Sequence, residues 1–376
     1  MSHTSRRRLL SLSLALAAAA AGCTDEDIGP RVPPPPRGIV VLNGFGEPGL
    51  TLLADTGTAS THVGFEPFDG GSFTLEKDTV LTTSSKWAGS LLYVADARTG
   101  DFASIQLPAN SNPANARFVE HPGLGRVAAV ALRDSNAVAL VKVSGDGAGS
   151  YTRVRDVGQC PTDAFRDAST LWVVVSNQRC ASDYATLGPA HAVWIPDAAT
   201  AAREIIAFGV SARGAGSAVV LRDTAYIFTI GLTSFGGNIP TPPAVSRVDL
   251  RRRQLINTIL IPEAVIGNVM RLGADGRLYV SAFTTSDFTQ QRVFAFDPST
   301  MDYRGEREAG KSYLRLQKSS GGAPNCAAAT ADARGNVYCV ENSATGASTL
   351  FVFAPNGTQL RSAPAGLGGI DIALRF

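Results

Sequence analysis

Residue types that commonly carry catalysis are sparse in this chain and are not grouped. The histidines beyond the N-terminal segment are His62, His121 and His191, and none has metal-ligand spacing to another. The sequence has no Gly-x-Ser-x-Gly nucleophile elbow. We therefore predict no catalytic residue and no metal ligand, although a triad assembled from distant loops stays open.

Two glycine-rich segments have the spacing of ligand loops. Residues 44–49 read Gly-Phe-Gly-Glu-Pro-Gly, but a dinucleotide site needs a helix after this motif, and here Pro48 and an apolar, strand-like run follow. Residues 145–149 lack the alternating acidic ligands of a calcium loop. We interpret both segments as turns and predict no cofactor.

Composition indicates a buried core. Hydrophobic residues make up 44% of the chain and charged residues 18%, with a net charge of +2. The basic residues are scattered, so no nucleic-acid partner is expected. The 38 glycines and 21 prolines suit a fold of many short strands and turns.

The N-terminus has the features of an export signal. Arg6–Arg8 precede an apolar run, Leu9–Ala21, that is too short to span a membrane comfortably as a helix. The run ends in Ala-Ala-Gly-Cys23, which resembles the lipobox of bacterial lipoproteins and implies acylation of Cys23. An ordinary cleaved signal is the alternative, and the arginines also resemble a twin-arginine signal.

A tether is expected after the signal. With residues 1–22 as signal peptide, residues 23–37 include four consecutive prolines that favour an extended, semi-rigid chain. Thr24 stands where, by resemblance, an Asp would retain a lipoprotein in the inner membrane. We expect a protein of the bacterial cell envelope, held by lipid at the outer membrane, facing the periplasm or the cell surface.

From Gly38 onward the sequence repeats one device, in which a turn signal leads into an aromatic and β-branched strand. Seven such landmarks, assigned to the second strand of each unit, recur at intervals of about 36 to 59 residues: Val41, Tyr93, Ala129, Trp172, Tyr226, Tyr279 and Tyr338. This spacing brackets that of propeller blades. Residues 38–376 are therefore predicted to form an all-β, seven-bladed β-propeller of four-stranded antiparallel blades.

The sixth unit illustrates the predicted blade. Its four strands are expected at 268–274, 278–283, 291–296 and 303–308, and the last is charged, as suits an exposed edge. The first unit has strands at 38–42, 50–54 and 61–65, one too few. The C-terminal strand 369–374 is predicted to complete it and to close the ring, giving a monomeric propeller.

Two segments resemble the blades of YncE-type (YVTN-type) propellers, which have Tyr-Val strands and an apolar-x-apolar-Asp strand. They are Leu92-Tyr93-Val94-Ala95-Asp96 and Val293-Phe294-Ala295-Phe296-Asp297-Pro298. The resemblance covers about residues 38–376 and implies the propeller fold. The family has no single chemistry, so no activity is implied.

Four cysteines remain after Cys23, in a chain bound for an oxidising compartment. Cys160 and Cys180 flank the first two strands of unit four, and Cys326 and Cys339 hold nearly the same relation in unit seven. Neighbouring antiparallel strands bring such positions side by side, so we predict disulfides 160–180 and 326–339, each worth roughly 3 kcal/mol. The alternative for these cysteines is a metal site, but the sequence has no Cys-x-x-Cys motif and no nearby His to support it.

Propeller ligands usually lie at one end of the central channel, near the ends of the second strands. The polar residues assigned to these ends are Asn43, Asp96, Arg133, Asn177, Thr284 and Asn342. Neutral amides dominate, which suits a small neutral or zwitterionic ligand. The alternative is that these side chains simply cap strand ends, where Asn and Asp favour turns.

Three longer insertions are expected at 179–189, 233–243 and 308–323. The second exposes Phe235 and Ile239 on a proline-rich loop, which would anchor a protein partner or pack over the propeller face.

We therefore expect a lipid-anchored binding or protein-scaffold module without catalysis of its own. A metal-dependent, lactonase-like hydrolase at the channel mouth is the alternative, and it would need convergent carboxylates there. A quinone-dependent dehydrogenase is a third reading that no stacking tryptophan or paired-cysteine motif supports.

Overall fold

The computed structural model describes residues 34–44, 47–54, 60–65, 73–84, 89–167, 170–197, 203–343 and 345–376. Cys23, the predicted signal segment and residues 23–33 of the predicted tether lie outside the described residues. Pro35–Phe376 form one compact unit, to which the rest of the description refers. Its described residues contain a short 3₁₀ helix, η1 (Phe235–Gly237), and no helix long and apolar enough to cross a membrane.

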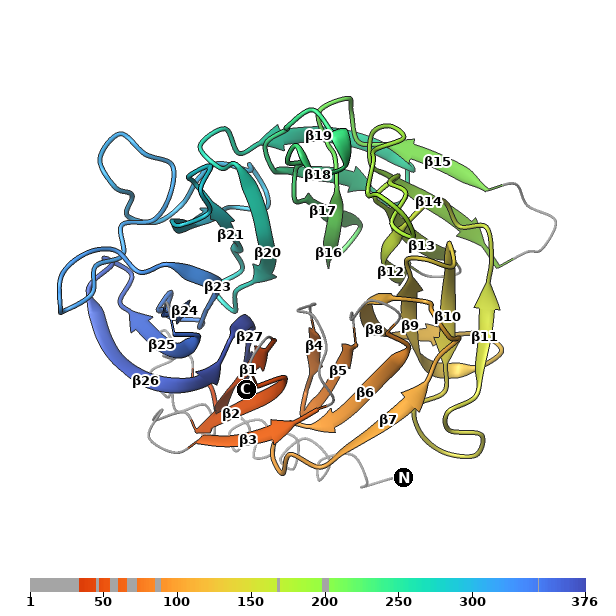
Figure 1. Cartoon of the computed structure of the whole chain (residues 1–376), viewed down its shortest axis with the longest axis horizontal. Coiled ribbons are helices and arrows are strands. Elements are labelled where there is room, and N and C mark those ends of the chain that lie inside the picture. The colour runs from red at the N-terminus through yellow and green to blue at the C-terminus, as the bar shows by residue number, and fades with distance from the viewer. Residues whose placement is uncertain are drawn as a thin grey trace, which may run out of the picture. The chain divides into compact units, whose positions relative to one another are not determined.

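Seven antiparallel sheets are arranged as blades around a central axis (Figure 1). Blade one contains β27 and β1–β3, and the following blades contain β4–β7, β8–β11, β12–β15, β16–β19, β20–β22 and β23–β26. The innermost strands, in blade order, are β27 (Gly369–Arg375), β4 (Phe73–Glu76), β8 (Pro113–His121), β12 (Pro161–Asp167), β16 (Ala215–Leu221), β20 (Ile266–Leu272) and β23 (Cys326–Ala331). The second strands are β1 (Gly38–Asn43), β5 (Thr79–Thr83), β9 (Gly125–Leu132), β13 (Thr170–Val175), β17 (Thr224–Thr229), β21 (Leu278–Phe283) and β24 (Val337–Asn342).

The outer half of each blade is more exposed. The third strands are β2 (Gly49–Ala54), β6 (Leu91–Asp96), β10 (Ala137–Val141), β14 (His191–Pro196), β18 (Ala244–Asp249), β22 (Gln291–Phe296) and β25 (Ala347–Phe353). The fourth strands are β3 (Ser60–Gly64), β7 (Phe102–Gln106), β11 (Tyr151–Val154), β15 (Glu204–Ala207), β19 (Gln254–Leu260) and β26 (Gln359–Leu367).

The predicted seven-bladed propeller and its mode of closure are confirmed. The C-terminal strand β27 pairs with β1 from Gly38↔Arg375 to Asn43↔Gly369, and it takes the innermost place in blade one. Chain segments from the two ends of the propeller therefore share one sheet, so the ring has no open edge between its first and last blades.

Blade six departs from the predicted pattern at its outer edge. Residues 303–308 form no strand, and Tyr303 contributes only an isolated bridge to Phe296. Gly305 has φ +94°, which turns the backbone out of the extended conformation. The prediction that the charged segment 303–308 lies at the outer edge of blade six is therefore correct. The turn at Gly305 prevents this segment from forming a strand paired with β22.

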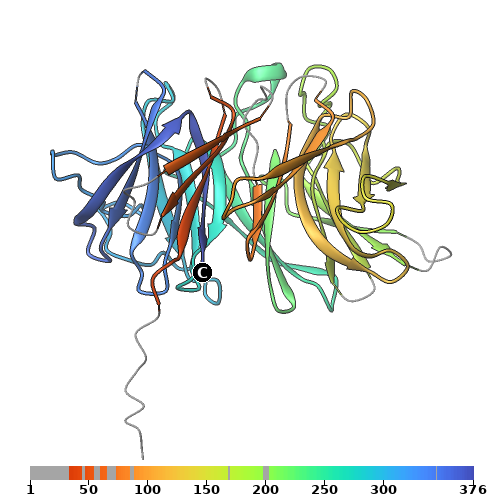
Figure 2. The same ribbon diagram turned by 90° about the horizontal axis from the view of Figure 1, so that it is seen from below.

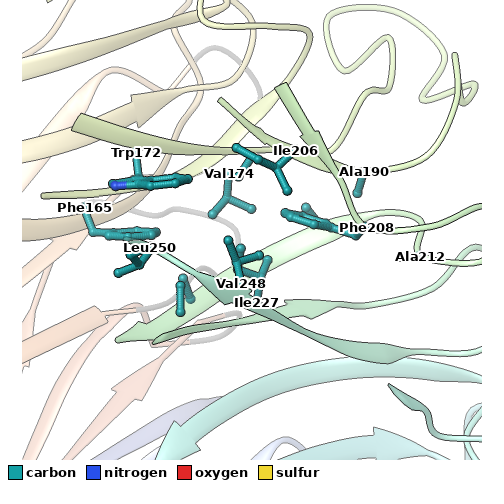
Figure 3. Packing of buried hydrophobic residues seen from close by; sticks show 14 residues of the cluster. Phe165, Trp172, Val174, Ala190, Ile206, Phe208, Ala212, Ile227, Val248 and Leu250 are labelled. Carbon is teal, nitrogen blue, oxygen red and sulfur yellow. The ribbon is translucent and has the colours of Figure 1, made fainter. Parts of the chain in front are cut away.

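The hydrophobic core is divided among the contacts between neighbouring blades. Seven clusters of buried residues join adjacent blades, and the one between blades seven and one also includes Val269 of blade six. Between blades four and five, Phe165 and Trp172 face Ile227 and Val248 (Figure 3). Because each sheet is buried on both faces, every residue of a strand such as β13 is buried, and apolar and polar residues do not alternate along it.

The strands define two faces of the ring. At the upper face the second strands end and the innermost strands begin; η1 lies there in Figure 2. The lower face carries the C-terminus and the turns between first and second strands.

One predicted landmark was wrong, because Tyr93 lies in the third strand, β6. The second strand β5, Thr-Val-Leu-Thr-Thr, has no aromatic residue, so the stronger run after it was mistaken for it.

Candidate functional site

The upper end of the central channel is lined by β-bulges. Within the part of the chain that the structure describes, the register shifts by one residue in the innermost strands of six blades, all except β4. Bulges re-aim side chains and free them from the regular ladder. The bulged residues that line this upper channel are Ala114, Asn115, Thr162, Gly216, Ser217, Asn268 and Ile370. They enclose a cavity of about 280 Å³.

Two of these bulged residues also connect their own blade to another blade. Asn268 Nδ2 donates a hydrogen bond to the Ala327 carbonyl of blade seven at 2.5 Å, and Asn115 Nδ2 donates to Gly216 O of blade five at 3.1 Å. The second contact spans from blade three to blade five. The channel is thus bordered by fixed amide groups rather than by loose side chains.

A second cavity of about 320 Å³, the mouth pocket, opens at the upper face beside blades three to six. Its polar lining comprises Arg133, Thr162, Ser176, Gln178, Tyr184, Thr233 and Asn238. Its apolar lining comprises Ala215, Ile230, Gly231, Leu232, Phe235, Ile266 and the cysteines 160 and 180. A few polar groups in a mostly apolar concavity are typical of small-molecule sites.

The mouth pocket is contiguous with the upper channel, because both are lined by Arg133, Thr162, Ala215 and Ile230. A lower cavity of about 290 Å³ shares Asn115 and Ser217 with the upper channel. A ligand entering at the mouth would therefore meet Arg133 at the junction with the channel.

Two of the predicted insertions build the outer wall of the mouth pocket. The Tyr184 and Phe235 rings lie 6.1 Å apart, one from each loop. Asn238 Nδ2 donates to Tyr184 O at 3.1 Å, and Asn238 Oδ1 accepts from the Thr186 N–H at 2.8 Å. The loops therefore support each other by both ring contact and hydrogen bonds.

The predicted disulfides are confirmed, and one of them belongs to this wall. Cys160 and Cys180 are joined with their Cα atoms 5.6 Å apart, and Cys326 and Cys339 with theirs 5.3 Å apart. Cys160–Cys180 ties the start of the 179–189 insertion to the residue before β12. The disulfide thus positions the segment that carries Tyr184.

Arg133 is held in place from behind. Its Nη2 donates to Asn112 Oδ1 at 3.2 Å, and its Nε approaches Asn112 O at 3.4 Å. Asn112 Nδ2 also donates to Asp134 Oδ1 at 3.3 Å. Burial raises the pKa of the Asp134 carboxyl, against the smaller opposing effects of Asn112 and Arg133. Neither Asn112 nor Asp134 lines the mouth pocket or the upper channel.

The other predicted second-strand residues make local contacts. Asn43 Nδ2 donates to Ala365 O and Leu367 O, each at 3.0 Å, and Asn342 Nδ2 donates to Gly369 O at 2.8 Å. Both amides hold the connection into β27. These contacts favour the strand-capping alternative for the two asparagines.

Asn177 and Thr284 also use their side chains for local contacts, as Asn43 and Asn342 do. Asn177 has φ +58°, and its Nδ2 donates to Pro189 O at 3.1 Å. Thr284 Oγ1 reaches Gln290 O at 3.4 Å within its own loop. Of the six predicted ligand residues, Arg133 is the one that lines the mouth pocket and the upper channel.

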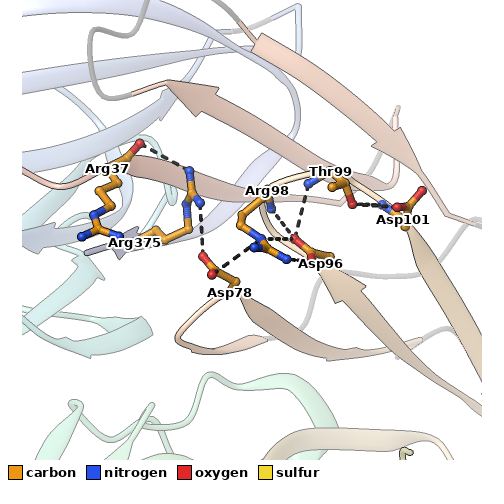
Figure 4. A network of polar contacts seen from close by, with 7 residues as sticks. All are labelled: Arg37, Asp78, Asp96, Arg98, Thr99, Asp101 and Arg375. Carbon is orange, nitrogen blue, oxygen red and sulfur yellow. Dashed lines mark hydrogen bonds and ion pairs between the residues drawn. The ribbon is translucent and has the colours of Figure 1, made fainter.

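Asp96 lies on the lower face, away from the other five, because it ends the third strand β6. Its placement at a second-strand end was wrong, for the same reason as Tyr93. Arg98 Nη2 donates to Asp96 Oδ2 at 2.8 Å and holds the pKa of the Asp96 carboxyl well below its usual range. Figure 4 shows this ion pair continuing through Asp78 to Arg375 at the end of β27.

Among the described residues, two fully buried carboxylates, Asp163 and Asp371, lie at the channel, and both accept hydrogen bonds from arginine. Arg117 donates from Nε and Nη2 to the two oxygens of Asp163, and Arg271 does the same to Asp371. The Ala218 N–H also donates to Asp163 Oδ2 at 2.8 Å. Both carboxylates are thus held as structural acceptors between blades.

Among the residues that the structure describes, no group of three or more His, Cys, Asp or Glu side chains could hold a metal ion. The described lining of the mouth pocket and upper channel contains no carboxylate. The convergent acids required by the lactonase alternative are therefore missing from this part of the chain.

Most pocket residues were not predicted. Thr162, Asn115 and Asn268 reach the channel through bulges, and a single extra residue in an apolar strand leaves no mark in the sequence pattern. Tyr184 and Asn238 lie in insertions that were singled out, so their loops were identifiable although their contact was not. Phe235 and Ile239 are 65% and 82% exposed, and Phe235 also lines the mouth pocket.

No protein-family model matches the chain, and no curated protein is significantly similar to it. Solved structures resemble it in fold. Over 83% of this chain and 91% of the other, it is similar to a chain of Kuenenia stuttgartiensis hydrazine synthase, with TM-score 0.57 and 14% identity. Over 93% of this chain and all of the other, it is similar to a protein of Bacteroides fragilis provisionally named a 6-phosphogluconolactonase, with TM-score 0.55 and 12% identity. At these identities the likeness shows the fold alone.

Proposed function

We propose that this protein is a binding propeller of the bacterial envelope, anchored through lipid on Cys23, which takes a small ligand in the mouth pocket. The observation that carries the binding site is the continuous concavity from the mouth pocket into the bulge-lined channel. Its walls are fixed in advance by a disulfide, paired loops and cross-blade amides. Because these walls are already ordered in the free protein, less conformational entropy is lost when a ligand binds.

Binding without chemistry is preferred over lactone hydrolysis for a specific reason. Asp163 and Asp371 are saturated by guanidinium and backbone donors, and Asp96 lies at the opposite face. A hydrolase of the lactonase type would use several convergent carboxylates at the mouth. The described residues supply none there.

The binding proposal is tested by thermal unfolding of the full-length protein against sugars, organic acids, amines and lactones. A ligand at a hundred times its Kd stabilises the folded state by about 2.7 kcal/mol. Any hit is repeated with Ala215→Phe, whose ring would occupy the junction of the two cavities, and with Phe235→Ala at the exposed rim. We expect both variants to weaken binding.

Two results would contradict the proposal. One is a ligand that stabilises wild type and both variants equally, because it must bind elsewhere. The other is lactone turnover abolished by EDTA, which would establish the hydrolase instead.

The lipid anchor is tested separately by Cys23→Ser. We expect the wild-type chain in the membrane fraction, with a mass increase at Cys23, and the variant in the soluble fraction. Equal membrane association of both would remove the anchor from the proposal without affecting the ligand site.

A further inference from the structure

We infer that the upper channel binds a neutral sugar ring, and that the mouth pocket takes an apolar group attached to that ring, as in an aryl or alkyl glycoside. This inference rests on the proposed function, since it names the ligand class of the same concavity. The β-bulges at the channel decide this class, because they set which polar atoms a ligand would meet.

The bulges place polar side chains in the channel from four consecutive blades. One comes from each of blades three to six, in the order Asn115, Thr162, Ser217 and Asn268. Apolar surface lies between and opposite them, supplied by Ile230, Val269 and, from the bulge of blade one, Ile370. A sugar ring carries hydroxyls around its edge and C–H groups on its faces, so it matches a lining of this mixed kind.

The two channel asparagines each have an amide oxygen open to a ligand. Nδ2 of Asn115 donates to Gly216 O, and Nδ2 of Asn268 donates to Ala327 O, so both amides are fixed in orientation. In the part of the chain that the structure describes, neither Oδ1 atom accepts a hydrogen bond and the Ser217 hydroxyl has no partner. A ligand hydroxyl both donates and accepts, so a ring bearing several hydroxyls could bond to all three groups.

The charge of the lining favours a neutral ring. Arg133 is the single ionised side chain in the described lining of the upper channel, and it is already bonded through Nη2 to Asn112 Oδ1. A charged ligand would lose its hydration here and would need a strong new partner in return. A neutral hydroxyl only exchanges hydrogen bonds with water for hydrogen bonds with the channel.

The mouth pocket is suited to an apolar group on the sugar. Its volume is about 320 Å³, beside about 280 Å³ for the upper channel, and the two cavities share part of their lining. Ile230, Leu232 and Ile266 line the mouth pocket, and the rings of Tyr184 and Phe235 border it. An aryl group can pack edge-on or stack against such rings. A glycoside would therefore fill both cavities at once.

The test is calorimetric titration of the full-length protein with the phenyl glycosides of glucose, galactose and mannose. The reference probe is 2-phenoxytetrahydropyran, which has the same two rings without the sugar hydroxyls. We expect one glycoside or more to bind about tenfold more tightly than the reference probe, because it makes several hydrogen bonds that the reference cannot make.

Ser217→Ala and Thr162→Val each remove a channel hydroxyl with little change of shape. Each should weaken the glycoside by about two- to tenfold and leave the reference probe unchanged. Phe235→Ala should weaken both probes by the same factor. Ser281→Ala is the matched control, because Ser281 is buried with an unbonded hydroxyl in the described part of the chain but lines neither cavity. It should leave every affinity unchanged.

The sugar inference would be overturned if the reference probe bound as tightly as the best glycoside, or if neither hydroxyl substitution altered the preference. Tighter binding of phenyl glucuronide than of phenyl glucoside would overturn the neutral class. In these cases a loss with Phe235→Ala would leave the mouth pocket standing as a binding site. Glycoside binding that is insensitive to all three substitutions would overturn both proposals. Failure of every glycoside to bind would overturn the ligand class, while the broader ligand screen would still decide the proposed function.

Discussion

At the scale of single residues, the channel contains two arginine–aspartate pairs that each connect more than one blade. Arg117 of blade three bonds Asp163 of blade four and also donates to Ala218 O of blade five at 2.7 Å. Arg271 bonds Asp371 and donates to Phe73 O at 2.6 Å. These contacts fix the innermost strands relative to one another.

Removing the aspartate of one of these arginine–aspartate pairs should leave the charge of its arginine uncompensated. We expect Asp163→Ala to lower the free energy of unfolding by about 3–5 kcal/mol, because Asp163 is fully buried. Asp223→Ala, at the exposed pair with Arg251, should cost within about 1 kcal/mol. Urea denaturation of both variants measures the difference, and equal losses would contradict a structural role for the channel pair.

His191 at the start of β14 predicts a pH dependence. Burial lowers the pKa of His191, and its contact with Pro189 O opposes this only partly. As the pH falls below about 6.5, the unfolded chain takes up the proton before the folded chain does. His191 should therefore contribute a loss of stability on acidification, of at most about 1.4 kcal/mol per pH unit. His191→Gln should flatten the urea-midpoint profile between pH 5 and 7, and an unchanged slope would exclude this origin.

At the scale of elements, the insertion loops show how a glycine makes a close contact possible. Gly236 has φ +70°, and a Cβ there would lie 2.4 Å from Asp183 O in the neighbouring loop. Gly237 has φ +72°, but nothing lies within 4 Å of its Cβ position. The two glycines share a backbone conformation and differ only in their neighbours.

This difference provides a controlled test of the loop contact. Alanine at either position should cost about 1–2 kcal/mol of backbone strain. Gly236→Ala should in addition push the loops apart and speed hydrogen exchange of the 179–189 segment, including the Thr186 amide that bonds Asn238. Gly237→Ala should leave that exchange unchanged, and similar exchange in the two variants would argue against close packing as the cause.

Element prediction succeeded where the signal was a long apolar run and failed where it was weak. Strands such as β13 and β21 stand where the sequence places them. The polar strand β5 was missed, and this error moved Tyr93 and Asp96 to the wrong face. Residues 303–308 lacked a ladder because of a glycine within them.

At the scale of the whole molecule, closure through β27 is the feature on which stability depends. We expect deletion of residues 369–376 to abolish cooperative unfolding, because it exposes the β1 edge, opens the apolar contacts of blades seven and one, and leaves Arg271 without Asp371. Circular dichroism during thermal unfolding provides the measurement.

Removal of Phe376 alone is the control, since this residue follows β27 and is 49% exposed. That variant should unfold cooperatively, close to the wild-type temperature. A full deletion that retains a sharp transition would show that the ring is stable without its closing strand.

The sequence by itself determined the all-β class, the number of blades, the closing strand and both disulfide pairs. These follow from local apolar runs, their spacing, and cysteine positions within repeated units, all of which are properties of neighbouring residues. Only the tertiary structure decided the site. Arg133 becomes a pocket residue because bulges and two insertions from different blades meet around it, and such meetings depend on how separate blades are oriented, which no local pattern records.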